Sequence, residues 1–308
     1  MSDQNNNDKI VSSNEETQDS SIFFQLKQRH FIRYILIALF AAIILKTFFI
    51  EADTIPTESM ENTLLAGDFI IVNKVSYTFS TPRFIPLTNI RISSFKIFKT
   101  GTPKRNDIIV FHFPGYLNEI EPNENMDFIK RIVCCPGDTL QIKDKKVIVN
   151  NKKISDPTTA IISMNSILKK GKRDSRIFPQ GFNWNSDNYG PIVIPKKGMT
   201  VEVNPKNINL WELSIDRDLG YHAVSVEGTV ITIFGKPVRN YTFKKNYFFV
   251  MGDYRDDSMD SRYWGFLPED NIIGKAELIY WSWDKSKSFG LTNFLDAIRW
   301  SRIFKIIH

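Results

Sequence analysis

The pattern of apolar and polar positions divides the chain into three parts. Residues 1–26 are rich in Asn, Ser, Asp, Glu and Gln, so we expect them to be disordered. Residues 27–50 contain a nearly continuous apolar run from Phe31 to Ile50, about 20 residues, which matches the thickness of a bilayer core. Beyond residue 50, short apolar runs bounded by Gly, Pro, Asn and Asp predict strands.

The apolar run predicts one transmembrane anchor, with a core helix and a cleaved signal sequence as the alternatives. The run is apolar on all sides rather than on one stripe, and no convincing small-x-small cleavage site follows it. Three basic residues precede its centre and four acidic residues follow it: Lys27, Arg29 and Arg33, then Glu51, Asp53, Glu58 and Glu61. The positive-inside rule therefore predicts a single pass with a cytoplasmic N-terminus and the body of the chain outside.

The body of the chain is predicted to be mainly β. Strands are expected over 69–74, 107–113, 127–133, 139–143, 229–234, 247–251 and 272–283. Asn150-Asn151 and Glu227-Gly228 lie between such runs and predict hairpin tips. Because strands do not alternate with long helical patterns, the fold class predicted is an antiparallel β-sheet core with an inserted smaller β-rich region.

Composition places the boundaries of these regions. Residues 51–149 and 244–285 make the predicted β core, and residues 150–243, with many Lys and Asn and several Pro and Gly breaks, make the inserted subdomain. In residues 286–308, apolar positions at helical spacing precede three basic residues and predict an amphipathic basic helix. This helix would either pack on the body or lie on a membrane surface.

Charge and cysteine content narrow the function only slightly. The formal net charge of +6 could favour an anionic membrane surface or nucleic acid, and alone it decides neither. Cys134 and Cys135 are adjacent, which disfavours a disulfide, and are expected to be small buried residues at a strand end. The two cysteines and four histidines show no metal-ligand spacing, so neither a metal nor a cofactor is expected.

Two segments carry a candidate nucleophile and a candidate base. Ser59 follows Pro56, which restricts the backbone and could hold the hydroxyl rigidly, although a helix cap or a turn would also explain a serine there. In the strand 127–133, alternation gives Lys130 the apolar neighbours Phe128 and Ile132. Burial there would lower the pKa of Lys130 from about 10.4 toward neutrality, as a base requires.

The third segment, GDYRDDSMDSRYWG over 252–265, mixes charges of both signs. A calcium loop is disfavoured because Arg255 and Arg262 would repel the ion and the carboxylate spacing does not fit. Asp–Arg pairs that brace a site, with a serine free to hydrogen-bond the catalytic amine, explain the mixture better.

These segments, in this order behind one N-terminal span, resemble the bacterial type I signal peptidase family. IPTESM is similar to the family's serine motif, DFIKRIVCCPGD to its lysine motif and GDYRDDSMDSRYWG to its late glycine-aspartate-rich motif. GDFIIVNK is similar to the strand between the first two. The resemblance implies a serine endopeptidase of the bacterial inner membrane that cleaves signal peptides from exported preproteins without a cofactor.

By position, the resemblance makes Ser59 the nucleophile and Lys130 the general base. Supporting roles are implied for four further residues: Ser258 would orient the lysine, Thr57 would join the Ser59 amide in an oxyanion hole, and Asp260 and Arg262 would form a structural ion pair. Substrate pockets for small side chains at the first and third positions before the cut would be lined by Ile55, Phe128 and Ile129. The implied partners are preproteins and the lipid bilayer; neither nucleic acid nor a second copy of the chain is expected.

Three positions depart from the family pattern. Asn62 stands in place of a proline, Tyr254 in place of an asparagine, and Asp53 where an aromatic residue is common. None removes a catalytic group, but the first and third bear on how substrate fits.

Three other functions compete with this interpretation. A Ser-His-Asp hydrolase needs a suitably placed histidine, and neither His112 nor His222 lies in a recognisable motif. A self-cleaving repressor-type serine-lysine protease would be cytoplasmic and carry a DNA-binding head. An inactive membrane-tethered binding or scaffold module would have little reason to keep Ser59, Lys130 and Ser258 together.

Overall fold

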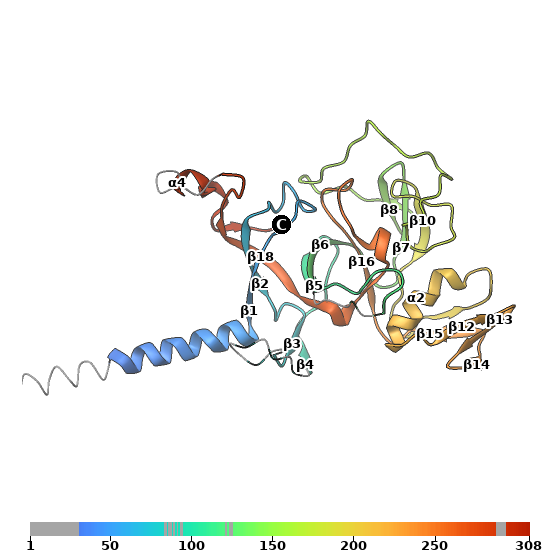
Figure 1. Ribbon diagram of the computed structural model, residues 1–308, viewed down its shortest axis with the longest axis horizontal. Coiled ribbons are helices and arrows are strands. Elements are labelled where there is room, and N and C mark those ends of the chain that lie inside the picture. Colours follow the sequence, from blue (N-terminus) through green and yellow to red (C-terminus); the bar gives the residue numbers. More distant parts are fainter. Residues whose placement is uncertain are drawn as a thin grey trace, which may run out of the picture. The chain divides into compact units, whose positions relative to one another are not determined.

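The computed structural model describes residues 31–82, 95–120, 126–287 and 294–308, together with the isolated positions 85, 88, 90, 92 and 122. The predicted apolar span forms a helix, Phe31–Phe48, that is long and apolar enough to cross a membrane. This helix belongs to one compact unit, and residues 50–80 with 95–308 make a second (Figure 1). The predicted disorder of 1–26 and the basic residues Lys27 and Arg29 lie outside the described residues.

The second unit is built on an antiparallel sheet, as predicted. The strands run in the order β1-β2-β18-β5-β6-β16-β17, with β19 also paired to β18. Their bounds are β1 Ile50–Thr54, β2 Asp68–Asn73, β5 Ile108–His112, β6 Asp127–Cys134, β16 Tyr247–Met251, β17 Leu267–Pro268, β18 Ile272–Ser282 and β19 Lys305–Ile306. Strands far apart in sequence are therefore neighbours, since β18 lies between β2 and β5 (Figure 1).

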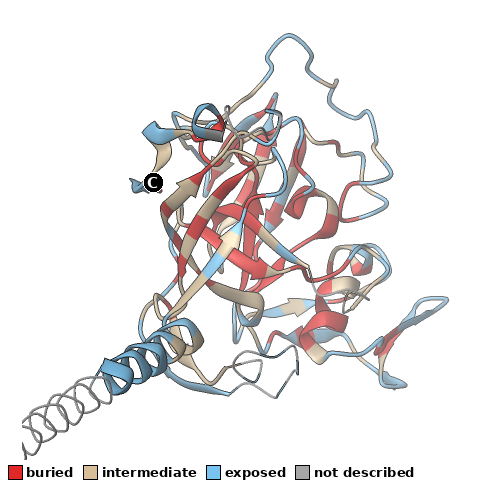
Figure 2. Ribbon diagram, turned by 60° about the vertical axis from the view of Figure 1, so that its left-hand side comes forward, coloured by how far each residue is buried: buried red, intermediate tan, exposed pale blue. Residues whose placement is uncertain are grey.

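The central strands are apolar on both faces, and each face has its own core. In β5, Ile108 and Val110 pack with Ile55 in one cluster, whereas Ile109 and Phe111 pack in another. Alternate side chains of a strand point to opposite faces, so an uninterrupted apolar run is what a sheet covered on both sides requires. The buried residues follow these strands through the centre of the unit (Figure 2).

Residues 139–242 contain small sheets and a helix, and this part of the chain begins before the insertion predicted over 150–243. One sheet has the order β10-β7-β8-β9, a second pairs β11 with β15, and a third joins β12, β13 and β14. The bounds are β7 Thr139–Lys143, β8 Lys146–Val149, β9 Lys152–Lys153, β10 Tyr189–Val193, β11 Thr200–Glu202, α2 Ile208–Leu219, β12 Val224–Glu227, β13 Val230–Ile233, β14 Lys236–Pro237 and β15 Asn240–Thr242. Its apolar residues share one cluster with Val133, Phe249 and Met251 of the main sheet.

Helix α2 was not predicted from the sequence. Its apolar stripe, Ile208, Trp211 and Ile215, is interrupted by the buried polar residues Asp216 and Arg217. Arg217 is satisfied by distant partners, because its guanidinium donates to the carbonyls of Trp264 and Gly115, and Asp216 accepts from the N–H groups of Ala223 and Val224 just after the helix. Buried polar side chains are stable only when they have hydrogen-bond partners, and the local sequence does not reveal those partners. The apolar positions alone therefore did not predict the helix.

One predicted hairpin tip is confirmed and the other shifts by a residue. Asn150 and Asn151 have φ of 51° and 64° between β8 and β9, as a tight hairpin turn requires. In the second hairpin Glu227 pairs with Val230, so the tip consists of Gly228 and Thr229 rather than Glu227 and Gly228. Asparagine and glycine are the residues that most readily adopt positive φ.

The amphipathic helix predicted in residues 286–308 is wrong for the described part of that segment. The described part contains short elements instead: α4 Phe294–Ala297, the 3-10 turn η2 Trp300–Arg302 and β19. Two tertiary contacts override the helical spacing, because Arg302 Nε donates to buried Asp68 at 3.0 Å and Ile307 is buried in the same cluster as Ile55. Residues 291–293 lie outside the described residues. The remaining elements are β3 Thr78–Ser80, β4 Lys96–Lys99, α3 Ser261–Trp264 and the 3-10 turn η1 Glu269–Asn271.

Candidate active site

Ser59 lies in a turn that directly follows the edge strand β1. Met60 and Leu64 are fully buried beneath it, and Leu64 N donates to Met60 O at 2.7 Å. The Tyr254 backbone N–H donates to Ser59 O at 3.1 Å, which ties the turn to the loop after β16. These contacts fix the backbone at Ser59, and the Ser59 side chain is half-buried.

Lys130 reaches Ser59 from β6. Its Nζ lies 2.7 Å from Ser59 Oγ and 3.0 Å from the Ile129 carbonyl oxygen, and the side chain is only 4% exposed. Burial lowers the pKa of Lys130 to about 8, although Asp260 and Asp253 act in the opposite direction. A lysine with a pKa near 8 is neutral in a substantial fraction at ordinary pH, and a neutral amine at this distance can take the proton of the hydroxyl.

Ser258 lies close to the Ser59 backbone because Gly252 lacks a side chain. A Cβ added at Gly252 would lie 2.3 Å from Ser258 Oγ and 2.5 Å from Ser59 O, distances that no real Cβ contact tolerates. Ser258 is 7% exposed, and its Oγ is buried without a hydrogen-bond partner among the described residues. The contact to Lys130 expected from the sequence is therefore not formed here, and an orienting role for Ser258 remains a prediction.

Asp260 and Arg262 form a buried two-point ion pair. Arg262 Nε and Nη2 donate to the two carboxylate oxygens of Asp260, each at 2.9 Å, and the Gly252 N–H donates to Asp260 at 3.1 Å. Burial favours the protonated form of Asp260, but Arg262 and these N–H donors together lower its pKa below the usual value. The pair shapes the loop that carries Gly252 and Ser258.

A second buried pair, Arg131 with Asp253, was not identified from the sequence. Arg131 Nε and Nη2 donate to Asp253 at 2.8 and 2.7 Å, and the Thr63 hydroxyl also donates to this carboxylate. Arg131 directly follows Lys130, and Asp253 directly follows Gly252. This proximity to motif residues was the only local sign that the two residues belong to the site. Nothing in the sequence says that residues 122 positions apart meet.

The predicted substrate-contacting residues fall on different surfaces. Ile55 and Ile129 lie in one cluster at the edge near Ser59. Phe128 points to the opposite face of β6, where its ring stacks on Phe113 with centroids 4.6 Å apart and lies 5.5 Å from Lys130 Nζ. Thr57 is exposed in the bend two residues before Ser59. The structure therefore brings Ile55 and Ile129 together but not Phe128 with them.

Two strand edges are open beside Ser59. In the described part of the chain, β1 pairs only with β2 and is the first strand of the sheet. Among the described residues, positions 128–130 of β6 pair with β5 alone, because pairing with β16 begins at Arg131. Exposed strand edges offer unpaired N–H and C=O groups to an extended peptide.

The imidazoles of His112 and His222 are not part of this cluster. His112 contacts Asp127 across the β5–β6 pair, and His222 lies 3.4 Å from Asp216 in the inserted region. Within the described ranges, no three His, Cys, Asp or Glu side chains converge in a way that could hold a metal ion. Cys134 is buried at the end of β6, as expected, whereas Cys135 is only half-buried; both are free thiols.

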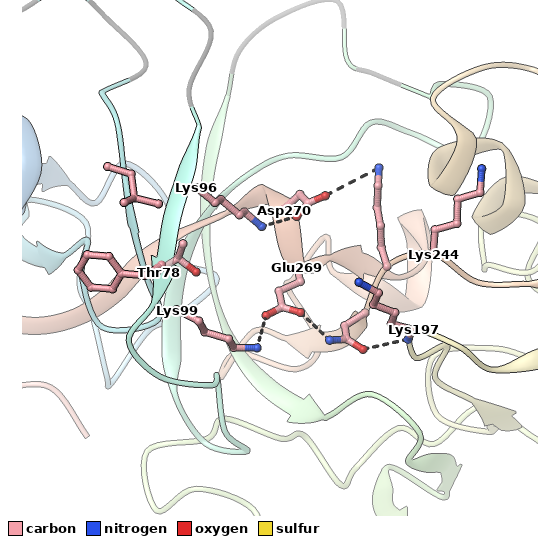
Figure 3. Close-up of a pocket in the computed structure, with 11 residues that line it drawn as sticks. Thr78, Lys96, Lys99, Lys197, Lys244, Glu269 and Asp270 are labelled. Carbon is pink, nitrogen blue, oxygen red and sulfur yellow. Dashed lines mark hydrogen bonds and ion pairs between the residues drawn. The ribbon is translucent and has the colours of Figure 1, made fainter.

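A separate hollow of about 370 Å³ lies between the β3–β4 hairpin and η1 (Figure 3). Lys99 Nζ contacts Glu269 at 2.9 Å, and Lys96 pairs with Asp270, so these ion pairs join the hairpin to the sheet. Neither Ser59 nor Lys130 lines this hollow. The candidate pair Ser59 and Lys130 therefore lies at the open strand edges and not in this hollow.

A serine hydroxyl that contacts a buried amine is an arrangement typical of serine-lysine hydrolases. A family model described as signal peptidase, peptidase S26, matches residues 28–281. Signal peptidase I of Buchnera aphidicola subsp. Baizongia pistaciae is 34% identical over 85% of this chain and 79% of its own length. The protein from Buchnera aphidicola subsp. Schizaphis graminum is 32% identical over 81% of this chain and 73% of its own length.

A third relative, signal peptidase I of Pseudomonas aeruginosa, is 28% identical over 83% of this chain and 73% of its own length. The class of protein that these matches define is a serine endopeptidase. The chain belongs to the signal peptidase family, peptidase S26.

Proposed function

We propose that this protein cleaves signal peptides from exported preproteins, with Ser59 as nucleophile and Lys130 as general base. The observation that carries the proposal is the 2.7 Å contact between Ser59 Oγ and the amine of buried Lys130. Relatives that share most of the chain are named signal peptidase I, and this supports the choice of substrate. No cofactor takes part in the proposed chemistry.

The proposed reaction is acyl transfer in two steps. Neutral Lys130 accepts the proton of Ser59 as Oγ attacks the scissile carbonyl, and the resulting ammonium protonates the leaving amine when the peptide bond breaks. Lys130 then takes a proton from water as it attacks the acyl-enzyme, and the ammonium returns this proton to Ser59 Oγ when the ester bond breaks and the new C-terminus of the signal peptide leaves. The Ser59 N–H and the Thr57 hydroxyl are the proposed donors to the oxyanion, each worth about 3 kcal/mol by analogy with other hydrolases.

The proposed substrate binds in extended form between the two open edges. Main-chain pairing along β1 gives affinity, and alternate side chains then face Ile55 and Ile129. The helix Phe31–Phe48 acts as the membrane anchor in this proposal, with the N-terminus in the cytoplasm and the catalytic unit outside. A substrate held in the same bilayer by its own apolar segment would reach this site without leaving the membrane.

Cleavage of a synthetic preprotein in detergent tests the proposal. Wild-type protein should release the mature chain, and Ser59→Ala should lower kcat/KM by at least about a thousandfold because the nucleophile is lost. Ser225→Ala, on the exposed strand β12, serves as the matched serine control and should cut normally. A folded wild type that leaves the preprotein intact would instead favour the inactive scaffold.

A further inference from the structure

The loop after β16 lies between the turn of Ser59 and a segment of the inserted region. On one side of the loop, the Tyr254 N–H donates to the Ser59 carbonyl at 3.1 Å. On the other side, the Ile161 N–H donates to Asp253 O at 2.9 Å, and the Arg255 N–H donates to Ile161 O at 3.0 Å. Successive backbone groups of an extended segment face opposite sides, so the loop is held from both sides in the manner of a central strand.

Residues 156–163 form a strap along this loop. Asp156 accepts a hydrogen bond from Arg255 Nη1 at 2.8 Å, and the Ser163 N–H donates to the Asp256 carboxylate at 2.7 Å. The Arg255 side chain is only 6% exposed, and a buried cation is stable only with a partner. The strap therefore binds the loop through side chains as well as through the backbone, and at several points along its length.

The hydroxyl of Thr159 joins the strap to the turn of Ser59. Its Oγ1 atom lies 2.6 Å from Thr63 Oγ1 and 3.3 Å from a carboxylate oxygen of Asp253. Thr63 is 7% exposed and belongs to the same turn as Ser59, where its N–H donates to Met60 O at 3.1 Å. One half-buried hydroxyl of the inserted region therefore contacts both the turn that carries the nucleophile and the loop beside it.

The strap supports the nucleophile rather than the substrate edges. Ser59 Oγ is 2.7 Å from Lys130 Nζ, and proton transfer requires about 2.6–3.2 Å between such atoms. Lys130 lies on the central strand β6, whereas Ser59 lies on a turn that the loop helps to hold. Among the described residues, the hydrogen bonds of the strap go to the loop, Thr63 and Lys145, and none goes to β1 or to residues 128–130 of β6. A displaced turn would therefore slow the chemical step and leave substrate binding nearly unchanged.

We propose that the strap is a positioning element for the proposed reaction, with Thr159 and Asp156 as its positioning residues. The Thr159 hydroxyl holds the turn and the Asp156 carboxylate holds Arg255, so that Ser59 stays within reach of Lys130. The proposal rests on the proposed function and gives the inserted region a part in the chemical step. Loss of a strap contact should therefore lower kcat and have little effect on KM.

Cleavage kinetics with a synthetic preprotein in detergent test the proposal. Thr159→Val removes the hydroxyl at nearly constant volume and should lower kcat about tenfold, with KM changed by less than about twofold. Thr159→Ser keeps the hydroxyl and should keep kcat within about twofold of the wild-type value. Thr158→Val, at the exposed neighbouring threonine, is the matched control and should cut normally.

Hydrogen exchange separates a local effect from a general loss of stability. In Thr159→Val, the backbone amides of residues 252–258 should exchange about ten times faster than in wild type, while those of β18 should keep their wild-type rates. A protein that is only less stable overall would exchange faster in both segments. If Thr159→Val does not fold, Asp156→Asn replaces it, because this side chain is 28% exposed; kcat should fall about threefold at unchanged KM.

The role of the strap is wrong if Thr159→Val cuts like Thr158→Val, if Thr159→Ser loses as much kcat as Thr159→Val, or if the loss appears in KM alone. Faster exchange in both segments, or an unchanged kcat in Asp156→Asn, would overturn it as well. When wild-type protein cuts the preprotein in a Ser59-dependent manner, any of these results leaves the proposed function intact. If folded wild-type protein leaves the preprotein uncut, the proposed function itself is wrong.

Discussion

Arg131 and Asp253 make a two-point ion pair that joins β6, the strand of Lys130, to the loop after β16. The donor distances are 2.8 and 2.7 Å, and the two side chains are 4% and 1% exposed. Arg131 directly follows Lys130 and Asp253 directly follows Gly252. Because the Thr63 hydroxyl also binds Asp253, the turn that follows Ser59 is held by the same pair.

Removing one partner of this pair should destabilise the fold more than removing both. Arg131→Met leaves a buried carboxylate without its cation and should lower the free energy of unfolding by about 3–5 kcal/mol. The double variant Arg131→Met with Asp253→Leu should recover part of that loss. Urea unfolding of the wild type and the variants measures both effects; a double variant less stable than the single one would contradict the expectation.

Substitution of Lys130 should abolish cleavage without unfolding the protein. Lys130→Ala removes the base, and Lys130→Arg supplies a group that stays protonated, so each should lose about a hundred- to ten-thousandfold in kcat/KM. Lys143→Arg, an exposed position at the end of β7, is the matched control. Near-normal cleavage by a folded Lys130→Arg enzyme would rule out lysine as the base.

The pH profile should report the titration of Lys130. The amine accepts a proton only when neutral, and burial lowers its pKa to about 8. The value of kcat/KM should therefore rise about tenfold per pH unit below pH 8 and level off above it. Fixed-time cleavage assays from about pH 6 to about pH 9.5 measure kcat/KM across this profile. Circular dichroism at each pH checks that the protein stays folded. A flat profile across this range would be inconsistent with a lysine base.

Asn62 should not tolerate the proline that is usual in the family at this position. Its φ of 68° is inaccessible to proline, whose ring fixes φ near −65°. Asn62→Pro should cost about 1–3 kcal/mol in stability and distort the turn that carries Ser59, whereas Asn62→Gly should change stability by less than about 1 kcal/mol. Thermal unfolding of both variants checks this, and equal stability would show that the turn adopts another backbone conformation.

The proposed topology makes a separate prediction. Protease added to sealed, right-side-out spheroplasts should digest the catalytic unit and leave a short N-terminal fragment that contains Phe31–Phe48. An antibody against residues 1–20 would detect that fragment, and a cytoplasmic marker protein should stay intact as the control for sealing. Full protection of the catalytic unit in verified preparations would reverse the orientation.

The strands were predictable because their apolar and β-branched runs carry the signal locally. The run Tyr247–Met251 was predicted with its observed bounds. The contact between Ser59 and Lys130 was predicted from the resemblance of the motifs to a known family. The motif sequences alone do not indicate that the two side chains meet. Helix α2 could not be predicted, because its buried Arg217 depends on the carbonyl of Trp264 elsewhere in the fold. The helix expected after residue 291 failed for the related reason that Arg302 binds Asp68, a residue 234 positions away.

The pairing of early and late segments has a consequence for the newly made protein. Ser59 and Lys130 are 71 positions apart, but Arg131 and Asp253 are separated by 122 positions, and the Ile161 N–H donates to the Asp253 carbonyl from within the inserted region. A chain that emerges N-terminus first thus exposes its nucleophile and base well before the loop that braces them exists. Contacts of such long sequence separation also form slowly. In the proposed topology and mechanism, the protease should therefore remain inactive throughout its own synthesis and export, and should begin to cut only after most of the chain lies on the side of the membrane where its substrates are.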